Sequence, residues 1–227
     1  MKIVISKSYG EKTVFQRLAL ECKEGEITCI LGGSGVGKTT LLKALGGLID
    51  FEGGKSGCDN TAFVFQEPRL LPHLTARENV LYTGASEAQA DDAMEKCRLT
   101  GVANQRASTL SGGEKQRVAL ARCFCTDACL WLLDEPFSAL DTSLKTALWQ
   151  DFVALWLQKK PTVVLVTHDL EEAWSLGHRI VLLRDGEIVY DCQPVRTKHP
   201  TPYGENSEEK QAFLRAVLAE NTTKQYL

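Results

Sequence analysis

A glycine-rich segment that ends in lysine and threonine constrains this chain more than any other part of its sequence. Residues 32–39 fit the pattern G-x-x-x-x-G-K-[S/T], and a short apolar run at 27–31 precedes them. Leucines and alanines at helical spacing follow, so we expect the glycines at a strand-to-helix turn. Glycine lets the backbone approach a ligand closely, and the start of a helix adds partial positive charge.

This segment predicts a phosphate-binding loop, against the simpler alternative of a flexible turn with a chance lysine. We expect Lys38 to contact the β- and γ-phosphates of a nucleotide, and the Thr39 hydroxyl to bind Mg²⁺. The residues expected to contact the nucleotide are Gly32, Gly33, Ser34, Gly35, Val36, Gly37, Lys38, Thr39 and Thr40. The loop predicts nucleotide binding but not the task that it serves.

The composition limits the class of protein. With 227 residues, 44% of them apolar, the chain has enough material for a sizeable core. A net charge of −3 gives no basic footprint, so we expect no nucleic-acid partner. No apolar run approaches the roughly 20 residues that span a bilayer, and the apolar start at 1–7 is too short for a signal peptide. We therefore expect a cytoplasmic location.

The chain has eight cysteines, and none forms a C-x-x-C pair. In a cytoplasmic protein we expect them to be reduced and to pack as small apolar side chains. Cys123, Cys125 and Cys129 are close in the sequence, but helical spacing would not bring all three to one metal ion, and no suitably spaced histidine accompanies them. No metal site is predicted there.

The first half of the chain predicts an antiparallel hairpin, the loop helix and then a helical insertion. Extended segments at 2–6 and 13–22 flank a turn near Tyr9, which either packs on its own hairpin or stacks on an adenine ring. Residues 53–57 are glycine-rich and are expected to form a loop. Gln66 follows a strand at 61–65, where an α/β sheet gathers ligand groups, although such a residue is more often an ordinary loop residue. Residues 70–107 predict short helices, one of them opened by a capping box at 75–78.

The segment Leu110–Arg117 predicts the start of another helix with an unusual pair of glycines. Ser111 and Glu114 fit a capping box, which is a purely structural explanation. It does not explain Gly112 and Gly113, which weaken a helix start. Glycines there favour close approach of a ligand, and a helix N-terminus attracts anions.

Three polar groups follow predicted buried strands in the second half. Asp134 and Glu135 follow the run at 129–133, so Asp134 is a candidate Mg²⁺ ligand through water and Glu135 a candidate to polarise the attacking water. His168 follows the run at 162–166. Asp185 and Gly186 predict a hairpin turn. A linker at 198–202 and an amphipathic helix at 207–220 are expected to end the chain.

Taken together, these motifs resemble the ATP-binding subunits of ABC transporters. The residues that carry the resemblance are the loop 32–39, Gln66, the Leu-Ser-Gly-Gly-Glu core of 110–117, Asp134, Glu135, residues 138–141 with Asp141, and His168. The resemblance covers residues 1–195 and implies an α/β fold, a P-loop NTPase of ABC type. Its mixed central sheet would carry an antiparallel β subdomain and a helical subdomain at about 70–107. Residues 196–227 would be a short C-terminal linker and helix.

The resemblance also implies roles. Two copies would form a head-to-tail dimer with two ATP molecules, each between one copy's phosphate loop and the other's Ser111, Gly112 and Gly113. Tyr9 would stack on adenine, Asp141 would couple the two sites, and His168 would contact the γ-phosphate. Glu135 would be the catalytic base. Gln66 would contact Mg²⁺ and sense integral membrane permease subunits, which would dock beside it on the helical subdomain.

Residues 66–72 and 75–80 most resemble importers of nitrate, sulfonates, taurine and similar small solutes. That resemblance implies a peripheral place on the inner face of the cell membrane and an extracytoplasmic solute-binding protein in the system. Residues 46–62 are short for the family, so the local architecture there is an open question. The alternatives are an ATPase of a cell-division or lipoprotein-release membrane complex, or a soluble ABC ATPase. The transported solute is not predicted, because specificity lies in other subunits.

Overall fold

A six-stranded sheet organises the larger part of the molecule. The computed structural model describes residues 1–195 and 198–222, without the side chains of residues 220–222. The strand order is β5-β6-β7-β3-β8-β9. Its strands are β3 (Ile27–Leu31), β5 (Thr61–Val64), β6 (Leu130–Asp134), β7 (Thr162–Thr167), β8 (Arg179–Arg184) and β9 (Glu187–Cys192). Neighbouring strands from β5 to β8 are parallel, so their carboxyl ends meet at one edge of the sheet, and only β9 is antiparallel.

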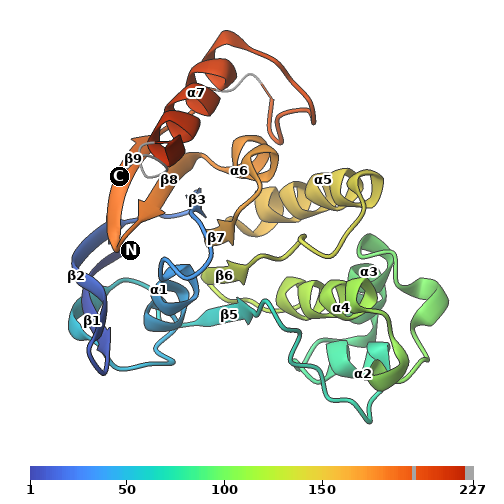
Figure 1. Ribbon diagram of the computed structural model, residues 1–227. Coiled ribbons are helices and arrows are strands. Elements are labelled where there is room, and N and C mark those ends of the chain that lie inside the picture. Colours follow the sequence, from blue (N-terminus) through green and yellow to red (C-terminus); the bar gives the residue numbers. More distant parts are fainter. Residues whose placement is uncertain (196–197, 223–227) are drawn as a thin grey trace.

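The central strands are apolar throughout because both faces of the sheet are covered. Successive residues of β6 alternate between two cores: Trp131 and Leu133 belong to one, and Leu130 and Leu132 to the other. The first core includes residues of α4 (Gly112–Phe124), α5 (Thr142–Lys159) and α6 (Leu170–Leu176). The second includes α1 (Lys38–Leu45) and the antiparallel sheet. Figure 1 shows these two layers on either side of the strands.

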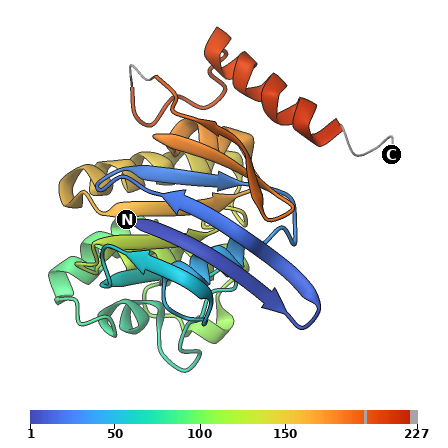
Figure 2. The ribbon, with the colours of Figure 1, turned by 90° about the vertical axis from the view of Figure 1, so that its left-hand side faces the viewer.

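A three-stranded antiparallel sheet forms from β1 (Lys2–Tyr9), β2 (Lys12–Glu21) and β4 (Glu52–Ser56), in the order β2-β1-β4. Figure 2 views the molecule from the side of this sheet. The β1–β2 hairpin confirms the expectation from the sequence, but the loop expected at 53–57 is wrong, because 52–56 is strand β4. It pairs with β1 in the register Val4↔Gly54. Every residue of β4 is exposed, so the strand lacks the alternation that identifies a strand in a sequence.

Gly53 explains how a glycine-rich strand fits there. Its φ is +123°, and a Cβ atom at this position would overlap the carbonyl oxygen of Val4 on the neighbouring strand. Only glycine allows this close approach of the two backbones. Gly54 has open space around it. The short stretch between α1 and β5 therefore completes the antiparallel sheet with a single strand.

A group of short helices packs beside α4 at the lower right of Figure 1. It consists of α2 (Ala76–Leu81), α3 (Glu87–Lys96), and the 3-10 turns η1 (Thr100–Val102) and η2 (Ala107–Thr109). The capping box of α2 is present as expected, with Thr75 and Glu78 exchanging hydrogen bonds, and Ser86 and Gln89 make an equivalent box on α3. These elements fall within or near 70–107, where the sequence predicts a helical insertion.

The C-terminal part packs against α6 and β9. Helix α7 (Glu208–Thr222) stacks Phe213 on Trp174 of α6, with ring centroids 5.2 Å apart. The segment 198–202, expected to be a linker, also packs here: the backbone N–H of Thr201 donates to the carbonyl of Ser175 at 3.0 Å. Among the residues that the structure describes, none of the helices is both long and apolar enough to cross a lipid bilayer.

The expectation that all eight cysteines are reduced is wrong for two of them. Cys58 and Cys129 form a disulfide with a Cα–Cα distance of 6.2 Å. They precede β5 and β6, which pair in parallel with Thr61 opposite Leu130, so the sheet brings together residues 71 positions apart. The sequence gives no local signal for this contact. Cys22, Cys29, Cys97 and Cys123 are buried thiols, as expected.

Candidate active site

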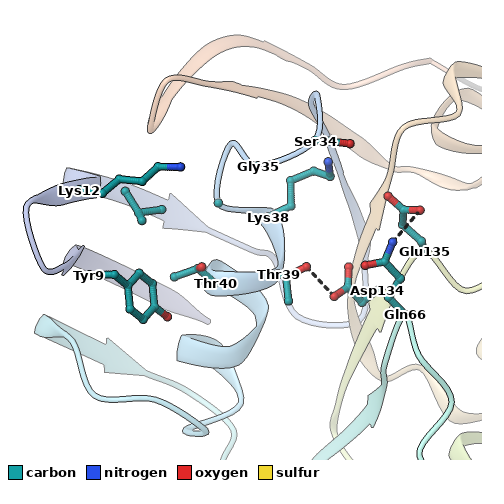
Figure 3. Close-up of a pocket in the computed structure, with 12 residues that line it drawn as sticks. Tyr9, Lys12, Ser34, Gly35, Lys38, Thr39, Thr40, Gln66, Asp134 and Glu135 are labelled. Carbon is teal, nitrogen blue, oxygen red and sulfur yellow. Dashed lines mark hydrogen bonds between the residues drawn. The ribbon is translucent and has the colours of Figure 1, made fainter.

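A pocket of about 340 Å³ lies where the phosphate loop meets the antiparallel sheet and the carboxyl end of β6. Figure 3 shows its side chains arriving from three directions. The lining residues are Tyr9, Lys12, Val14, Ser34, Gly35, Gly37, Lys38, Thr39, Thr40, Gln66, Asp134 and Glu135. The motifs that the sequence predicts for phosphate, metal and water therefore share one cavity.

The turn from β3 into α1 shapes one wall of the pocket. Helix α1 begins at Lys38, directly after Gly37, whose φ of +104° lies in the left-handed region. A Cβ atom on Gly37 would lie 2.6 Å from both Phe15 Cζ and Val14 Cγ1, so side chains of β2 pack directly against the loop at this glycine. Glycine is required here by both its backbone angle and its neighbours.

Lys38 is folded back on its own loop. Its ammonium donates to the carbonyl oxygens of Gly32 and Gly33, each at 2.8 Å, and the residue is only 7% exposed. Burial lowers the pKa of the Lys38 ammonium, while the charges of Glu135 and Asp134 act to raise it. The ammonium is therefore held inside the loop by two backbone carbonyl oxygens.

Thr39 and Asp134 form the polar floor of the pocket. The Thr39 hydroxyl donates to Asp134 Oδ2 at 2.8 Å, and Asp134 is 2% exposed at the end of β6. Burial raises the pKa of Asp134, although the Thr39 hydrogen bond opposes this. Hydroxyl and carboxylate oxygens are hard ligands that Mg²⁺ prefers, so this pair fits the ion expected from the sequence.

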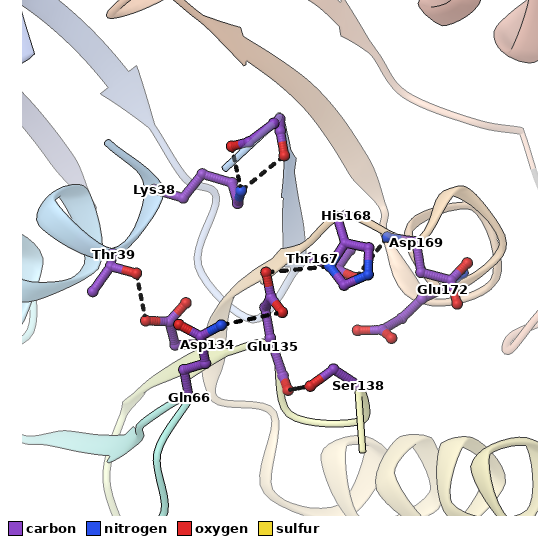
Figure 4. A network of polar contacts seen from close by, with 12 residues as sticks. Lys38, Thr39, Gln66, Asp134, Glu135, Ser138, Thr167, His168, Asp169 and Glu172 are labelled. Atoms are coloured by element: carbon purple, nitrogen blue, oxygen red, sulfur yellow. Dashed lines mark hydrogen bonds and ion pairs between the residues drawn. The ribbon is translucent and has the colours of Figure 1, made fainter. Parts of the chain in front are cut away.

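Glu135 lies at the rim, between a histidine and a glutamine (Figure 4). Its Oε1 is 3.2 Å from His168 Nδ1, and its Oε2 accepts from Gln66 Nε2 at 3.5 Å. The three residues follow β6, β7 and β5, three strands that lie side by side. This is why residues 66, 135 and 168 meet: the carboxyl ends of parallel strands share one edge.

The backbone of Glu135 is itself unusual. Its φ is +49°, an angle that costs a non-glycine residue about 1–3 kcal/mol. The surroundings hold it there: its N–H donates to the carbonyl of Val166 at 2.9 Å, and its carbonyl accepts from the Ser138 hydroxyl at 3.0 Å. The turn directs the carboxylate away from Asp134 and toward His168, so the two adjacent acids have different partners.

Tyr9 and Lys12 line the opposite wall, at the tip of the β1–β2 hairpin. Tyr9 is 51% exposed, and the Lys7 ammonium lies over one face of its ring, 5.0 Å from the ring centroid. The sequence indicates Tyr9 but not Lys12 or Val14. Its position in the same predicted turn as Tyr9 is the one signal that could have pointed to Lys12.

The Ser111 motif and Asp141 lie outside this pocket. Ser111 caps α4 in a capping box with Glu114, as expected from the sequence, and the residue is exposed. Asp141 caps α5, accepting from the N–H of Leu144 at 3.0 Å, and it is also exposed. The two motifs are neighbours, since a Cβ atom on Gly113 would lie 3.2 Å from the carbonyl oxygen of Ala139. They form a second surface patch that the single chain does not bring to its own phosphate loop.

The chain is similar to known proteins over most of its length. The family model described as "ABC transporter" matches residues 15–138. The aliphatic sulfonates import ATP-binding protein SsuB 2 of Pseudomonas savastanoi pv. phaseolicola is 42% identical over 193 residues, which cover 83% of this chain and 72% of that one. The aliphatic sulfonates import ATP-binding protein SsuB of Delftia acidovorans is 40% identical over 207 residues, which cover 86% of each.

A solved structure agrees with the fold. The ATP-binding cassette MJ0796, described as a dimeric post-hydrolysis state bound to ADP and Pi, superimposes with a TM-score of 0.76 at 32% identity. The match covers 85% of this chain and 98% of that one. The chain therefore belongs to the ABC transporter family, as an ATP-binding cassette that hydrolyses ATP.

Proposed function

We propose that this ATPase powers uptake of a small solute, of the class to which aliphatic sulfonates belong, through a separate integral membrane permease. The observation that carries the catalytic part is the Glu135 carboxylate, held by His168 and Gln66 at the rim of a phosphate-loop pocket. The names of the relatives support import. An extracytoplasmic solute-binding protein and a place on the inner face of the membrane belong to the same proposal.

The pocket residues have different roles in the proposed reaction. The backbone N–H groups of the loop and Lys38 bind the phosphates, and Tyr9 stacks on the adenine. Thr39, Asp134 and Gln66 would hold Mg²⁺, which when bound would supply positive charge near the phosphate oxygens. Glu135 accepts a proton from the attacking water, and His168 keeps the carboxylate oriented and contacts the γ-phosphate.

A second copy of the chain completes the site. Ser111, Gly112 and Gly113 begin a helix with an exposed N-terminus, which suits an anion, yet they do not line their own pocket. In a head-to-tail dimer they would contact the γ-phosphate on the partner copy, with Asp141 beside them. The dimeric state of the similar cassette supports this arrangement. Loss of the γ-phosphate on hydrolysis would remove the bridge and open the dimer.

Mixing two inactive variants tests the composite site. Lys38→Ala disables the phosphate loop and Ser111→Arg the opposing helix, so each homodimer should be inactive. A mixed dimer contains one site built from two intact halves and should regain ATPase activity. The control for Ser111→Arg is Ser86→Arg, which removes an equivalent capping box from α3. If mixing restores nothing while both variants stay folded, the head-to-tail arrangement is wrong.

The transport proposal has its own test. The chain is co-expressed with a permease encoded beside it, and complex formation and solute-stimulated ATPase activity are measured in proteoliposomes. Co-purification with stimulation by a sulfonate supports import. A stable complex with a lipoprotein-release or cell-division membrane protein would contradict the import proposal and would favour a role in that membrane complex.

A further inference from the structure

Three acidic side chains at the start of α6 pair with lysines from two other helices. Asp169 caps α6, accepting from the N–H groups of Glu171 at 2.8 Å and Glu172 at 3.3 Å. Lys145, in the first turn of α5, donates to Asp169 Oδ2 at 2.6 Å and lies 3.6 Å from Glu172 Oε2. The Lys145 side chain is 12% exposed and that of Glu172 is 2% exposed. The side chain of Asp169 is 29% exposed, so a partly buried polar cluster joins α5 to α6.

Each end of this link is one short step from the active-site loops. Lys145 stands four residues after Asp141 on the same helix, and its N–H donates to the Asp141 carbonyl at 2.9 Å. On the other side, Asp169 follows His168, whose ring faces Glu135 (Figure 4). One helical turn, the Lys145 side chain and a single peptide bond therefore connect Asp141 to His168.

The charges favour the Lys145–Asp169 pair over the contact to Glu172. Burial would raise the pKa of Asp169, but the hydrogen bond and charge of Lys145 hold it below its usual range. Burial raises the pKa of Glu172 to about 8, so near neutral pH this residue is largely protonated. A charge-assisted hydrogen bond is shorter and stronger than a bond between neutral groups. Asp169 is thus the anionic partner that fixes Lys145.

We propose that Lys145 is a positioning residue for ATP hydrolysis: through Asp169 it holds His168 against Glu135, so that the placement of His168 follows that of the Asp141 loop. The proposal rests on the ATPase activity of the chain and on nothing said of the permease. It gives Asp141 a physical route to the catalytic carboxylate of its own chain, in addition to any contact it makes across a dimer.

Lys210 provides a matched control, because it too pairs with an acidic residue of α6. It reaches α6 from α7, pairs with Glu171 Oε1 at 2.5 Å, and its side chain is 4% exposed. Like Lys145 it is a nearly buried lysine in an ion pair with α6. Glu171 uses its other oxygen to accept from the N–H of Gly204, and its carboxylate has no contact with Lys145 or His168 among those that the described residues make. Loss of Lys210 removes the same kind of interaction without touching Asp169.

The test compares Lys145→Met, Lys145→Arg and Lys210→Met in the full chain. Lys145→Met should lower kcat about tenfold or more, with little change in KM for ATP, because misplacement of a catalytic group acts on the chemical step. Lys145→Arg should restore most of kcat, since it keeps the charge. Lys210→Met should lower the melting temperature comparably and leave kcat near the wild-type value. Equal kcat losses in the two methionine variants, or wild-type kcat in Lys145→Met, overturn the proposal.

A second variant and a spectroscopic readout keep the test independent of folding and of turnover. Asp169→Asn retains a good helix cap but loses the ionic partner of Lys145, so it should show the same kcat loss as Lys145→Met. Nitrogen NMR of the His168 ring should respond to Glu135→Gln in the wild-type background. In Lys145→Met and in Asp169→Asn that response should disappear. If the response persists in both variants, His168 remains against Glu135 without the link and Lys145 has no positioning role.

Discussion

The carboxylate of Glu135 lies 3.2 Å from the Nδ1 atom of His168, although 33 residues separate them in the chain and they follow different strands. Neighbouring parallel strands β6 and β7 end at the same edge of the sheet and bring the pair together. Glu135 bends toward the histidine through a left-handed backbone angle that Val166 and Ser138 stabilise. The Glu135 carboxylate is thus held at the rim of the pocket at some cost in backbone strain.

The first prediction concerns this acceptor. Glu135→Gln should lower the ATPase rate about a hundredfold or more, because general base catalysis contributes about 10²–10⁴-fold. ATP binding should persist, since Lys38 and the loop are unchanged. Rates by phosphate release and affinity by calorimetry measure the two effects. Glu67→Gln, an exposed neighbour of Gln66, is the control and should behave as wild type. A normal rate in Glu135→Gln would assign the base elsewhere.

The second prediction concerns Lys38. Lys38→Ala removes charged hydrogen bonds worth about 1.5–3 kcal/mol each, so ATP affinity should fall at least about tenfold to a hundredfold. The stabilisation of the fold by added ATP should fall with it, which thermal unfolding with and without nucleotide detects. Lys2→Ala removes a lysine whose side chain is 66% exposed and should keep the full ATP-induced shift. An undiminished shift in Lys38→Ala would mean that the lysine does not contact the phosphates.

Adjacent glycines in β4 give a prediction about the fold. Gly53→Ala should destabilise the protein by about 1–3 kcal/mol or more, because the new Cβ meets the Val4 carbonyl at a positive φ. Gly54→Ala has open space and should change stability little. At this chain length each kcal/mol lowers the melting temperature by about 2–4 °C, which calorimetry resolves. Equal effects of the two substitutions would argue against the strand at 52–56.

Glu172 predicts a pH dependence of stability. In the folded protein burial raises its pKa to about 8, whereas the ordinary value is 4.5. Between these values the folded state holds a proton that the unfolded state has lost, so this group makes stability fall as pH rises. Glu172→Gln should remove that contribution, up to about 1.4 kcal/mol per pH unit.

Urea unfolding from pH 5.5 to 8 tests this. The stability of Glu172→Gln relative to wild type should increase steadily with pH. The exposed Glu95→Gln should show a constant difference from wild type. A parallel pair of curves for Glu172→Gln and wild type would show that Glu172 is ionised in the fold across this range.

The sequence predicted what depends on local pattern. The loop 32–39 and the acids at 134 and 135 are found where apolar runs end, because buried parallel strands are continuous apolar segments and their ends gather ligands. The β8–β9 hairpin was also predicted, from Asp185 and Gly186, which take φ values of +49° and +80° as such a turn requires.

What the sequence could not predict depends on distant contacts. Strand β4 has no buried face, so only its pairing with β1 reveals it. The Cys58–Cys129 disulfide depends on the β5–β6 register. Lys145 lies in the first turn of α5, and its partner Asp169 is 24 residues further along, so no spacing rule marks it. Lys12 needed the hairpin to turn it toward the pocket.

The tight contact of β2 with the phosphate loop bears on which nucleotides the pocket accepts. The side chains of Val14 and Phe15 pack against Gly37. The tip of the β8–β9 hairpin also packs against β2, since a Cβ atom on Gly186 would overlap the Val14 carbonyl oxygen. The hairpin that carries Tyr9 therefore lies at a fixed distance from the loop 32–39, which we propose binds the phosphates. A fixed offset selects ligands by their length from ring to terminal phosphate, while stacking on an aromatic ring tolerates any base. Selection by length predicts that GTP competes with ATP far better than AMP does, a difference that displacement of a fluorescent ATP analogue would measure.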